Sequence, residues 1–307
     1  MVRPRPRARI ARTPVFCYAG PRMTARIIDG KGIAQQVRAE VARGVEAFRA
    51  KYQRVPGLHV ILAGEDPGST VYVRGKEKAA LEVGMRGQVH RLPDTVTADH
   101  LLKLVMELNA DTTVDGILVQ LPLPGGLPAQ SILDTVDPAK DVDGFHPLNV
   151  GALWSGLPGI VPCTPNGCMR LLREAGTQLV GARALVVGRS HMVGKPMCGL
   201  LMNANATVSV AHSKTVDLPE RCREADVLIA AIGRAKMIRG DWIKPGATVI
   251  DVGMNRDENG KLCGDVDFVS AVGVATAITP VPGGVGPMTI AQLLENTLKA
   301  ALTRQAS

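Results

Sequence analysis

The chain has 307 residues, of which 46% are hydrophobic and 3% aromatic, so it is long enough for roughly two domains with aliphatic cores. The net charge of +8 is misleading, because residues 1–22 contain six arginines and no acid, which leaves +2 for the rest of the chain. A nucleic-acid-binding protein is expected to spread its basic residues over a folded surface, so nucleic acid is not expected as a partner.

The first 22 residues form a basic extension rich in Pro and Arg, without the apolar segment of a secretory signal. We expect it to be disordered or not translated, with the functional chain starting at Met23. No apolar run is long enough to span a bilayer, so no membrane partner is expected. The six cysteines show neither a C-x-x-C pair nor zinc spacing, which favours reduced thiols in a cytoplasmic protein without a metal.

Helical and strand patterns alternate through the first half of the chain at the spacing of β-α-β units. The predicted elements are a helix over 31–52, a strand over 58–64, a helix carrying Tyr72 and Lys76, a strand over 87–93, a helix over 97–109 and a strand within 115–126. This order predicts a mainly parallel sheet with helices packed on it.

A stretch rich in turn residues, 137–167, separates this half from a second α/β unit. That unit contains four strand-like runs, at 181–190, 206–213, 225–233 and 246–255. An amphipathic helix over 288–302 follows, and we expect it to fold back onto the first domain. The sequence therefore predicts an α/β protein with two domains.

Tyr72 and Lys76 lie one helical turn apart on the same predicted helix face. One interpretation is a lysine whose stem lies along that face while its ammonium reaches water. The other is a partly desolvated lysine in a cleft, available for chemistry. The helix by itself leaves both interpretations open.

Residues 184–196 have the pattern of a strand, a turn with Gly188, and a helix start at Gly194, a layout in which backbone N–H groups can meet a pyrophosphate. Any βαβ turn could require these glycines. After the next strand comes "HSKT", with Ser213, where NAD-binding folds carry an acid. Hydroxyl and ammonium donors suit a 2′-phosphate, which favours NADP over NAD, although a polar turn would look the same.

Six segments occur in one order along the chain: "YVRGK" (72–76), "GILVQLPLP" (116–124), "KDVDGFHPLNVG" (140–151), "PCTPNG" (162–167), "VVGRSHMVGKP" (186–196) and "TPVPGGVGPMT" (279–289). Together they closely resemble the bifunctional methylenetetrahydrofolate dehydrogenase/methenyltetrahydrofolate cyclohydrolase family of the bacterial FolD type. The resemblance covers Met23 to about Ala301. It does not extend to the formate-activating domain of larger eukaryotic relatives, so that activity is not expected.

The resemblance implies two reactions on one pterin. NADP+ takes a hydride from 5,10-methylenetetrahydrofolate, and water then opens the methenyl product to 10-formyltetrahydrofolate. The first step mainly requires positioning of the folate carbon against the nicotinamide. The second step requires proton transfer, which is the work of a general acid/base.

The resemblance also implies residue roles. Lys76 is the candidate acid/base, Gln120 would hold its amine without a stabilising negative charge, Tyr72 would stack on the folate, and Asp143 would bind the pterin N–H groups. From the residues alone, Gln120 reads as a loop-capping amide, and Asp141 and Asp143 could exchange roles. Further substrate contacts are expected at Val119, Leu121, Pro282, Gly283 and Gly284, and cofactor contacts at Gly188, Arg189, Ser190, Ser213 and Met254. Met254 stands where relatives more often have Ile.

The resemblance further implies a folate-binding catalytic domain over 23–160, completed by a C-terminal helix at 286–307, and a Rossmann-like NADP-binding domain over 161–285. It also implies a cytoplasmic homodimer acting on polyglutamylated tetrahydrofolates. Two rival interpretations are a dehydrogenase that has lost cyclohydrolase activity and a non-catalytic pterin or nucleotide binder. The second rival has no need for a paired lysine and glutamine.

Overall fold

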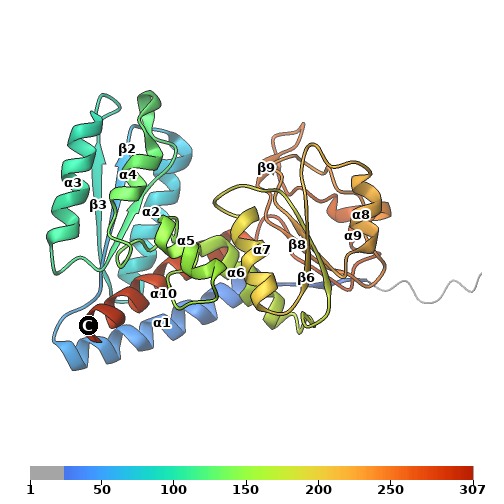
Figure 1. The fold of residues 1–307 in the computed structure, drawn as a ribbon, viewed down its shortest axis with the longest axis horizontal. Helices are drawn as coiled ribbons and strands as arrows, with labels where there is room; N and C mark the ends of the chain where they lie inside the picture. The colour runs from blue at the N-terminus through green and yellow to red at the C-terminus, as the bar shows by residue number, and fades with distance from the viewer. Residues whose placement is uncertain (1–23, 307) are drawn as a thin grey trace, which may run out of the picture.

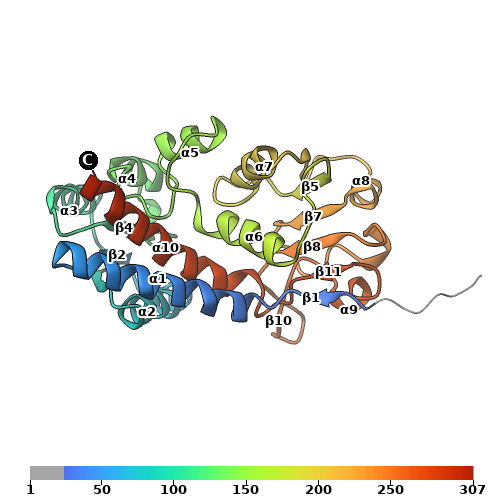
Figure 2. The same cartoon turned by 90° about the horizontal axis from the view of Figure 1, so that it is seen from below.

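The computed structural model describes residues 24–306, so the expectations for residues 1–22 and for Cys17 lie outside the described residues. Two α/β lobes stand side by side (Figure 1), and the long helices α1 and α10 run together along the first lobe (Figure 2). The predicted α/β class, with two domains and a returning C-terminal helix, is confirmed. Among the described residues, no helix is both long enough and apolar enough to cross a membrane.

The first lobe is built on a three-stranded parallel sheet in the order β3-β2-β4. Its elements are β2 (Gly57–Ala63), α2 (Pro67–Glu82), β3 (Arg86–Leu92), α3 (Ala98–Ala110), β4 (Gly116–Val119) and α4 (Ala129–Thr135). Every residue of β2 is buried, as expected for a central strand covered on both faces. The predicted strand–helix order of this half is confirmed.

Helix α2 carries Tyr72 and Lys76, and its start is fixed by local chemistry. The side chain of Asp66 accepts a hydrogen bond from the Ser69 backbone N–H at 2.7 Å, which caps the first turn. The buried positions of α2 are Ser69, Val73, Lys76, Ala79 and Ala80. Lys76 therefore points into the protein together with small apolar neighbours, rather than along the surface.

The second lobe contains a six-stranded parallel sheet in the order β1-β11-β8-β7-β5-β6. Its strands are β1 (Arg26–Ile27), β5 (Arg183–Val187), β6 (Thr207–Ala211), β7 (Val227–Ala230), β8 (Thr248–Asp251) and β11 (Ala277–Ile278). Its helices are α6 (Cys163–Glu174), α7 (Gly194–Asn203), α8 (Leu218–Glu224) and α9 (Phe268–Ala271), and β9 (Asn255–Arg256) and β10 (Leu262–Cys263) form a short hairpin. Each of the four predicted strand-like runs contains one strand of this sheet.

Two strands of this sheet were not expected from the sequence. β1 lies within the predicted first domain, yet it pairs in parallel with β11, Arg26 opposite Ala277. Both strands have two residues, too few to show an alternating pattern. The chain therefore enters the sheet of the second lobe before α1 carries it to the first, while the division at residue 160 stays a prediction.

Helices α1 (Gly30–Tyr52) and α10 (Val285–Ala306) run in the same direction, side by side (Figure 2). A Cβ on Gly44 would lie 2.5 Å from Leu298 Cδ2, so the two helices approach closely at this point. α10 is longer than the 288–302 indicated by the amphipathic pattern and close to the 286–307 implied by the resemblance, and it ends beside the first sheet. The turn-rich stretch 137–167 also contains a helix that was not predicted, α5 (Pro147–Trp154), as well as the start of α6.

The buried carboxylate of Asp115 joins the C-terminal ends of α1 and α10 to the start of β2. Asp115 is fully buried and accepts two hydrogen bonds from Arg54, at 2.7 and 2.9 Å, one from Arg304 at 3.2 Å and one from the Gly57 backbone N–H at 2.9 Å. Arg304 belongs to the last turns of α10. Asp115 therefore links the C-terminal helix to the sheet of the first lobe.

We expect Asp115→Asn to lower the free energy of unfolding by about 3 kcal/mol, because two arginines then lose a buried counter-charge. Denaturant titration measures the change. Asp241→Asn is the matched control, since Asp241 pairs with Arg239 on the exposed surface and its loss should lower the free energy of unfolding far less. Equal losses in the two variants would contradict the role given to Asp115.

Candidate active site

Lys76 and Gln120 meet at the carboxyl end of the first sheet. Lys76 is 6% exposed, and its Nζ donates a hydrogen bond to Gln120 Oε1 at 2.9 Å. The amide of Gln120 donates in turn from Nε2 to the Leu121 carbonyl at 2.7 Å, which turns its oxygen toward the lysine. The interpretation of a lysine reaching out to water is therefore wrong. Gln120 both caps its loop and holds the amine.

Tyr72 covers the same amine from the preceding helical turn. Lys76 Nζ lies 5.3 Å from the centre of the Tyr72 ring, within the range of a cation–π contact. Burial raises the pKa of the Tyr72 hydroxyl, while a hydrogen bond with Thr289 opposes that shift. The hydroxyl of Thr289 also lies 2.9 Å from the hydroxyl of Thr164, so side chains of α2, α6 and α10 meet here.

The two aspartates of the "DVD" segment have different environments. Asp141 accepts hydrogen bonds from the backbone N–H groups of Gly144 and His146, at 3.1 and 2.8 Å, and from the Asn149 amide at 2.9 Å. It therefore holds the loop that follows it. Asp143 instead faces the cavity beside Lys76. Of the two aspartates, Asp143 is the one that lines this cavity, and its role in binding the pterin stays a prediction.

Burial raises the pKa of the Asp143 carboxyl to about 6; the charge of Lys76 opposes this shift and that of Asp141 adds to it. The thiol of Cys163 lies 3.8 Å from Asp143 Oδ1. Burial, followed by the nearby Asp143 charge, raises the pKa of that thiol well above its usual value. Cys163 is therefore a neutral neighbour of Asp143 rather than a nucleophile.

These residues surround a cavity of about 200 Å³. Its lining consists of Tyr72, Lys76, Val119, Gln120, Leu121, Asp143, Phe145, Cys163, Thr164, Met192, Val193 and Thr289. The first six are predicted site residues. Cys163, Thr164 and Thr289 belong to the motifs "PCTPNG" and "TPVPGGVGPMT", which could have pointed to them. Met192 and Val193 belong to the motif "VVGRSHMVGKP", which indicates a nucleotide turn but not that these two residues reach this cavity from the second lobe.

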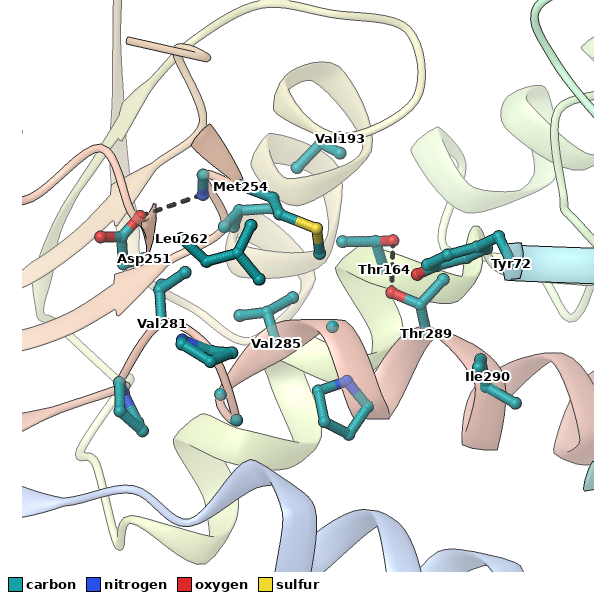
Figure 3. Close-up of a pocket in the computed structure, with 18 residues that line it drawn as sticks. Tyr72, Thr164, Val193, Asp251, Met254, Leu262, Val281, Val285, Thr289 and Ile290 are labelled. Atoms are coloured by element: carbon teal, nitrogen blue, oxygen red, sulfur yellow. Dashed lines mark hydrogen bonds between the residues drawn. The ribbon is translucent and has the colours of Figure 1, made fainter. Parts of the chain in front are cut away.

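A second cavity, of about 430 Å³, is shown in Figure 3 and shares part of its lining with the first. Tyr72, Thr164, Val193 and Thr289 line both cavities. The remaining lining comes from residues 251–254, from Leu262, from residues 280–287 and from Ile290. Predicted residues Met254, Pro282, Gly283 and Gly284 thus lie in the second cavity, not beside Lys76.

The glycine loop at 282–287 packs tightly against neighbouring backbone. A Cβ on Gly30 would collide with the Gly284 carbonyl, and a Cβ on Gly284 would lie 2.5 Å from the Pro280 carbonyl. The Lys31 backbone N–H also donates to the Gly283 carbonyl at 2.9 Å. Glycine is therefore required where the starts of α1 and α10 meet this loop.

The predicted nucleotide turn lies at the carboxyl end of β5, where ligands bind in open parallel sheets. Gly188 has a φ of +131°, and a Cβ there would collide with the Ala231 carbonyl. Ser190 Oγ accepts hydrogen bonds from the backbone N–H groups of Val193 and Gly194, at 3.2 and 3.3 Å, and so orders the start of α7.

Arg189, Ser190 and Ser213 are exposed at the ends of the neighbouring strands β5 and β6. These three and Gly188 line neither cavity. They form a separate group along the same edge of the sheet. A close-packed glycine turn, a helix start and exposed polar side chains at one sheet edge fit the phosphate groups of a nucleotide.

The fold and the site together define a two-domain α/β enzyme with a nucleotide-binding half and a lysine-containing cavity at the lobe boundary. The tetrahydrofolate dehydrogenase/cyclohydrolase catalytic-domain model matches residues 28–143, and the corresponding NAD(P)-binding-domain model matches residues 162–305. The chain belongs to the tetrahydrofolate dehydrogenase/cyclohydrolase family, in agreement with the resemblance found in the sequence.

Individual relatives agree with this assignment. The bifunctional protein FolD of Sorangium cellulosum is 62% identical over 285 residues, which cover 92% of this chain and 99% of that protein. The crystal structure of FolD from Campylobacter jejuni is 47% identical, with a TM-score of 0.89 and coverage of 91% and 99% of the two chains. The Trypanosoma brucei enzyme, solved with NADP cofactor and an inhibitor, is 40% identical, with a TM-score of 0.88 and coverage of 92% and 99%.

We expect Ser213→Asp to lower the ratio of kcat/KM for NADP+ to that for NAD+ by about tenfold or more, because the new carboxylate would repel a 2′-phosphate. Steady-state kinetics with both cofactors measure this ratio. Ser209→Asp, the same change on the exposed strand β6, is the control and should leave the ratio unchanged. An unaltered ratio in Ser213→Asp would remove Ser213 from the cofactor site.

Proposed function

We propose that both reactions of the family take place at the single cavity that contains Lys76 and Gln120. The chain is an NADP-dependent methylenetetrahydrofolate dehydrogenase and methenyltetrahydrofolate cyclohydrolase of one-carbon metabolism. It oxidises 5,10-methylenetetrahydrofolate to the methenyl form and hydrolyses that product to 10-formyltetrahydrofolate. When bound, NADP+ supplies the acceptor for the hydride that leaves the methylene carbon.

The observation that carries the proposal is the hydrogen bond from Lys76 Nζ to Gln120 Oε1. Gln120 is neutral, so it orients the amine without the electrostatic preference for ammonium that a carboxylate would add. The buried amine faces a cavity of about 200 Å³, large enough for the reacting carbon and a water molecule. Lys76 can therefore exchange protons with water and with the folate nitrogen during hydration and ring opening.

Tyr72 and Asp143 hold the folate in this proposal. The Tyr72 ring stacks on the aromatic part of the substrate and keeps Lys76 beneath it. Asp143 accepts hydrogen bonds from the pterin amino and ring N–H groups. Val119 and Leu121 provide apolar walls on either side of Gln120. The same positioning serves hydride loss, which is why a single cavity suffices for both reactions.

The second lobe holds the cofactor in this proposal. Gly188, Arg189 and Ser190 bind its phosphates at the end of β5, and Ser213 binds the 2′-phosphate at the end of β6. Met254 gives an apolar contact in the second cavity, where Pro282, Gly283 and Gly284 border the space between the cofactor and the folate. The catalytic role belongs to 23–160 with 286–307, and the cofactor role to 161–285.

The rival of a dehydrogenase without cyclohydrolase activity is disfavoured by the intact Lys76–Gln120 contact, which hydride transfer alone does not require.

The resemblance of the sequence also supports a cytoplasmic homodimer that prefers polyglutamylated folates. Sedimentation analysis tests the dimer, and KM values for mono- and polyglutamate substrates test the preference.

Lys76→Met should lower the cyclohydrolase rate by about 10²–10⁴-fold, the usual effect of losing a general acid/base, while methionine preserves length and folding. Gln120→Ala should affect the same step, and the double variant should be little worse than the worse single one. Methenyl accumulation and NADPH formation are followed together, and their ratio is the key quantity. Lys78→Met, which changes an exposed lysine of the same helix, is the control. Undiminished hydrolysis by Lys76→Met would exclude Lys76 from proton transfer.

The affinity for tetrahydrofolate should fall as the pH decreases below about 6, because protonation of Asp143 removes the carboxylate that accepts the pterin hydrogen bonds. Above that pH the group is charged and the affinity should level off. Anaerobic binding titrations between pH 5 and 7.5 measure the effect. Asp143→Asn should bind weakly at every pH and lack this dependence. A variant with the wild-type pH profile would show that another group is responsible.

A further inference from the structure

Two of the buried aspartates outside the Lys76 cavity, Asp251 and Asp265, lie together in the second lobe. Asp251, the last residue of β8, is 3% exposed, and its carboxylate accepts hydrogen bonds from the backbone N–H groups of Gly253, Asp265 and Val266 at 3.0, 2.9 and 2.9 Å. The Asp251 carboxylate thus connects the end of β8 to the segment that follows the β9–β10 hairpin.

Asp265, which is 0% exposed, extends this connection to the neighbouring strand. Its carboxylate accepts hydrogen bonds from three consecutive backbone N–H groups, those of Ile232, Gly233 and Arg234, at 2.6, 3.1 and 2.8 Å. A fourth hydrogen bond, at 2.9 Å, comes from the side-chain amide of Asn255. One carboxylate therefore fixes the loop after β7 and the hairpin after β8 to each other.

Two glycines allow these carboxylates to fit. A Cβ on Gly264 would collide with the Asp251 carboxylate, and a Cβ on Gly253 would collide with the Asp265 carboxylate. Asp251 therefore lies against Gly264, which directly precedes Asp265. Asp265 lies against Gly253, which follows Asp251 by two residues. Segments 251–255 and 264–266 interlock through this arrangement, in which no larger side chain fits.

Burial of two carboxylates without counter-charges carries a large unfavourable desolvation free energy. Their partners in the described part of the chain are backbone N–H groups and one amide, rather than basic side chains. Burial raises the pKa of Asp251 to about 7; its backbone hydrogen bonds oppose this shift and the charge of Asp265 adds to it. A carboxyl group with a pKa as strongly raised as that of Asp251 is typical of functional sites.

The location of the pair indicates which function it serves. Asp251 lines the second cavity together with Val252, Gly253 and Met254 (Figure 3). β7 and β8 are neighbours in the sheet, and the backbone of Ala231 at the end of β7 lies against Gly188 of the nucleotide turn. The loops held by Asp265 thus lie between that turn and the cavity that adjoins the folate site.

We propose that Asp251 and Asp265 are a positioning pair, which holds the loops 232–234 and 252–255 in the shape that binds the nicotinamide half of NADP. This inference rests on the assignment of the second cavity to the cofactor. Hydride transfer requires the nicotinamide to lie next to the folate carbon, and the second cavity is the one that shares a wall with the Lys76 cavity.

The two activities of the enzyme provide an internal test, because hydrolysis of methenyltetrahydrofolate needs no hydride acceptor. In Asp265→Asn one acceptor oxygen is replaced by an amide donor that faces two N–H donors, those of Ile232 and Gly233 on one side or those of Arg234 and Asn255 on the other. We expect the Kd for NADP+, measured by calorimetry, and the KM for NADP+ to rise about tenfold or more. The cyclohydrolase kcat/KM, measured without cofactor, should stay within about twofold of the wild-type value, because Asp265 does not line the Lys76 cavity.

Two controls separate positioning from general destabilisation. Asp267→Asn makes the same chemical change two residues away, at a side chain that does not cap α9, and should leave NADP+ binding unchanged. Asp115→Asn removes a buried carboxylate of the first lobe and should lower thermal stability without a selective loss of NADP+ affinity.

A parallel fall of both activities in Asp265→Asn, or an unchanged Kd for NADP+, would overturn the proposal. If Asp265→Asn does not fold, Asn255→Ala decides, since it removes one donor to Asp265 and keeps both carboxylates. It should raise the Kd for NADP+ by about threefold or more, and an unchanged value would also overturn the proposal. A wild-type protein without dehydrogenase activity would instead contradict the proposed function.

Discussion

The parallel packing of α10 on α1 is the constraint on which the rest of the molecule depends. Contacts between the two helices run in register from Gly30 beside Gly284 to Gly44 beside Leu298. At the far end, Arg304 joins Arg54 on the buried Asp115 carboxylate. Because each helix begins beside the second sheet and ends beside the first, this pair sets how the two lobes face each other. The two cavities share a wall only because that arrangement is fixed.

The shared wall has a chemical consequence. Tyr72, Thr164 and Thr289 come from α2, α6 and α10, and their hydroxyl groups meet where the two cavities adjoin. Val193 reaches the same place from the nucleotide turn. In the proposed function, a substrate beside Lys76 would have the hydride acceptor on one side and the proton-transferring amine on the other. Two reactions on one carbon require this proximity rather than two separate sites.

The electrostatics of the two cavities differ in a way that matches these tasks. Lys76 donates its hydrogen bond to a neutral amide, while the Asp143 carboxylate lies in the same cavity without a direct hydrogen bond to the amine. The second cavity instead has one buried carboxylate in its wall, that of Asp251, which accepts hydrogen bonds from backbone N–H groups and is linked through one of them to Asp265. In the proposed function, the first arrangement serves proton transfer and the second gives a rigid backbone surface.

The sequence by itself predicted most of the secondary structure, because the hydrophobic periodicity of segments such as 58–64 and 97–109 is a local property. The helical spacing placed Tyr72 one turn from Lys76, whereas Gln120 was assigned to the lysine through the family resemblance, since the residues alone indicate a loop-capping amide. The glycine loop at 282–284 was predicted to be functional, although not in which cavity it lies.

Only the tertiary structure decided the features that join distant parts of the chain. These include the pairing of β1 with β11, the choice of Asp143 over Asp141 at the cavity, the entry of Met192 into the Lys76 cavity, and the interlocked Asp251 and Asp265. A two-residue strand has no periodicity to detect, and an aspartate beside a glycine looks the same in a turn and in a buried hydrogen-bond network. Which of these it becomes depends on backbone groups that the fold brings to it from elsewhere in the chain.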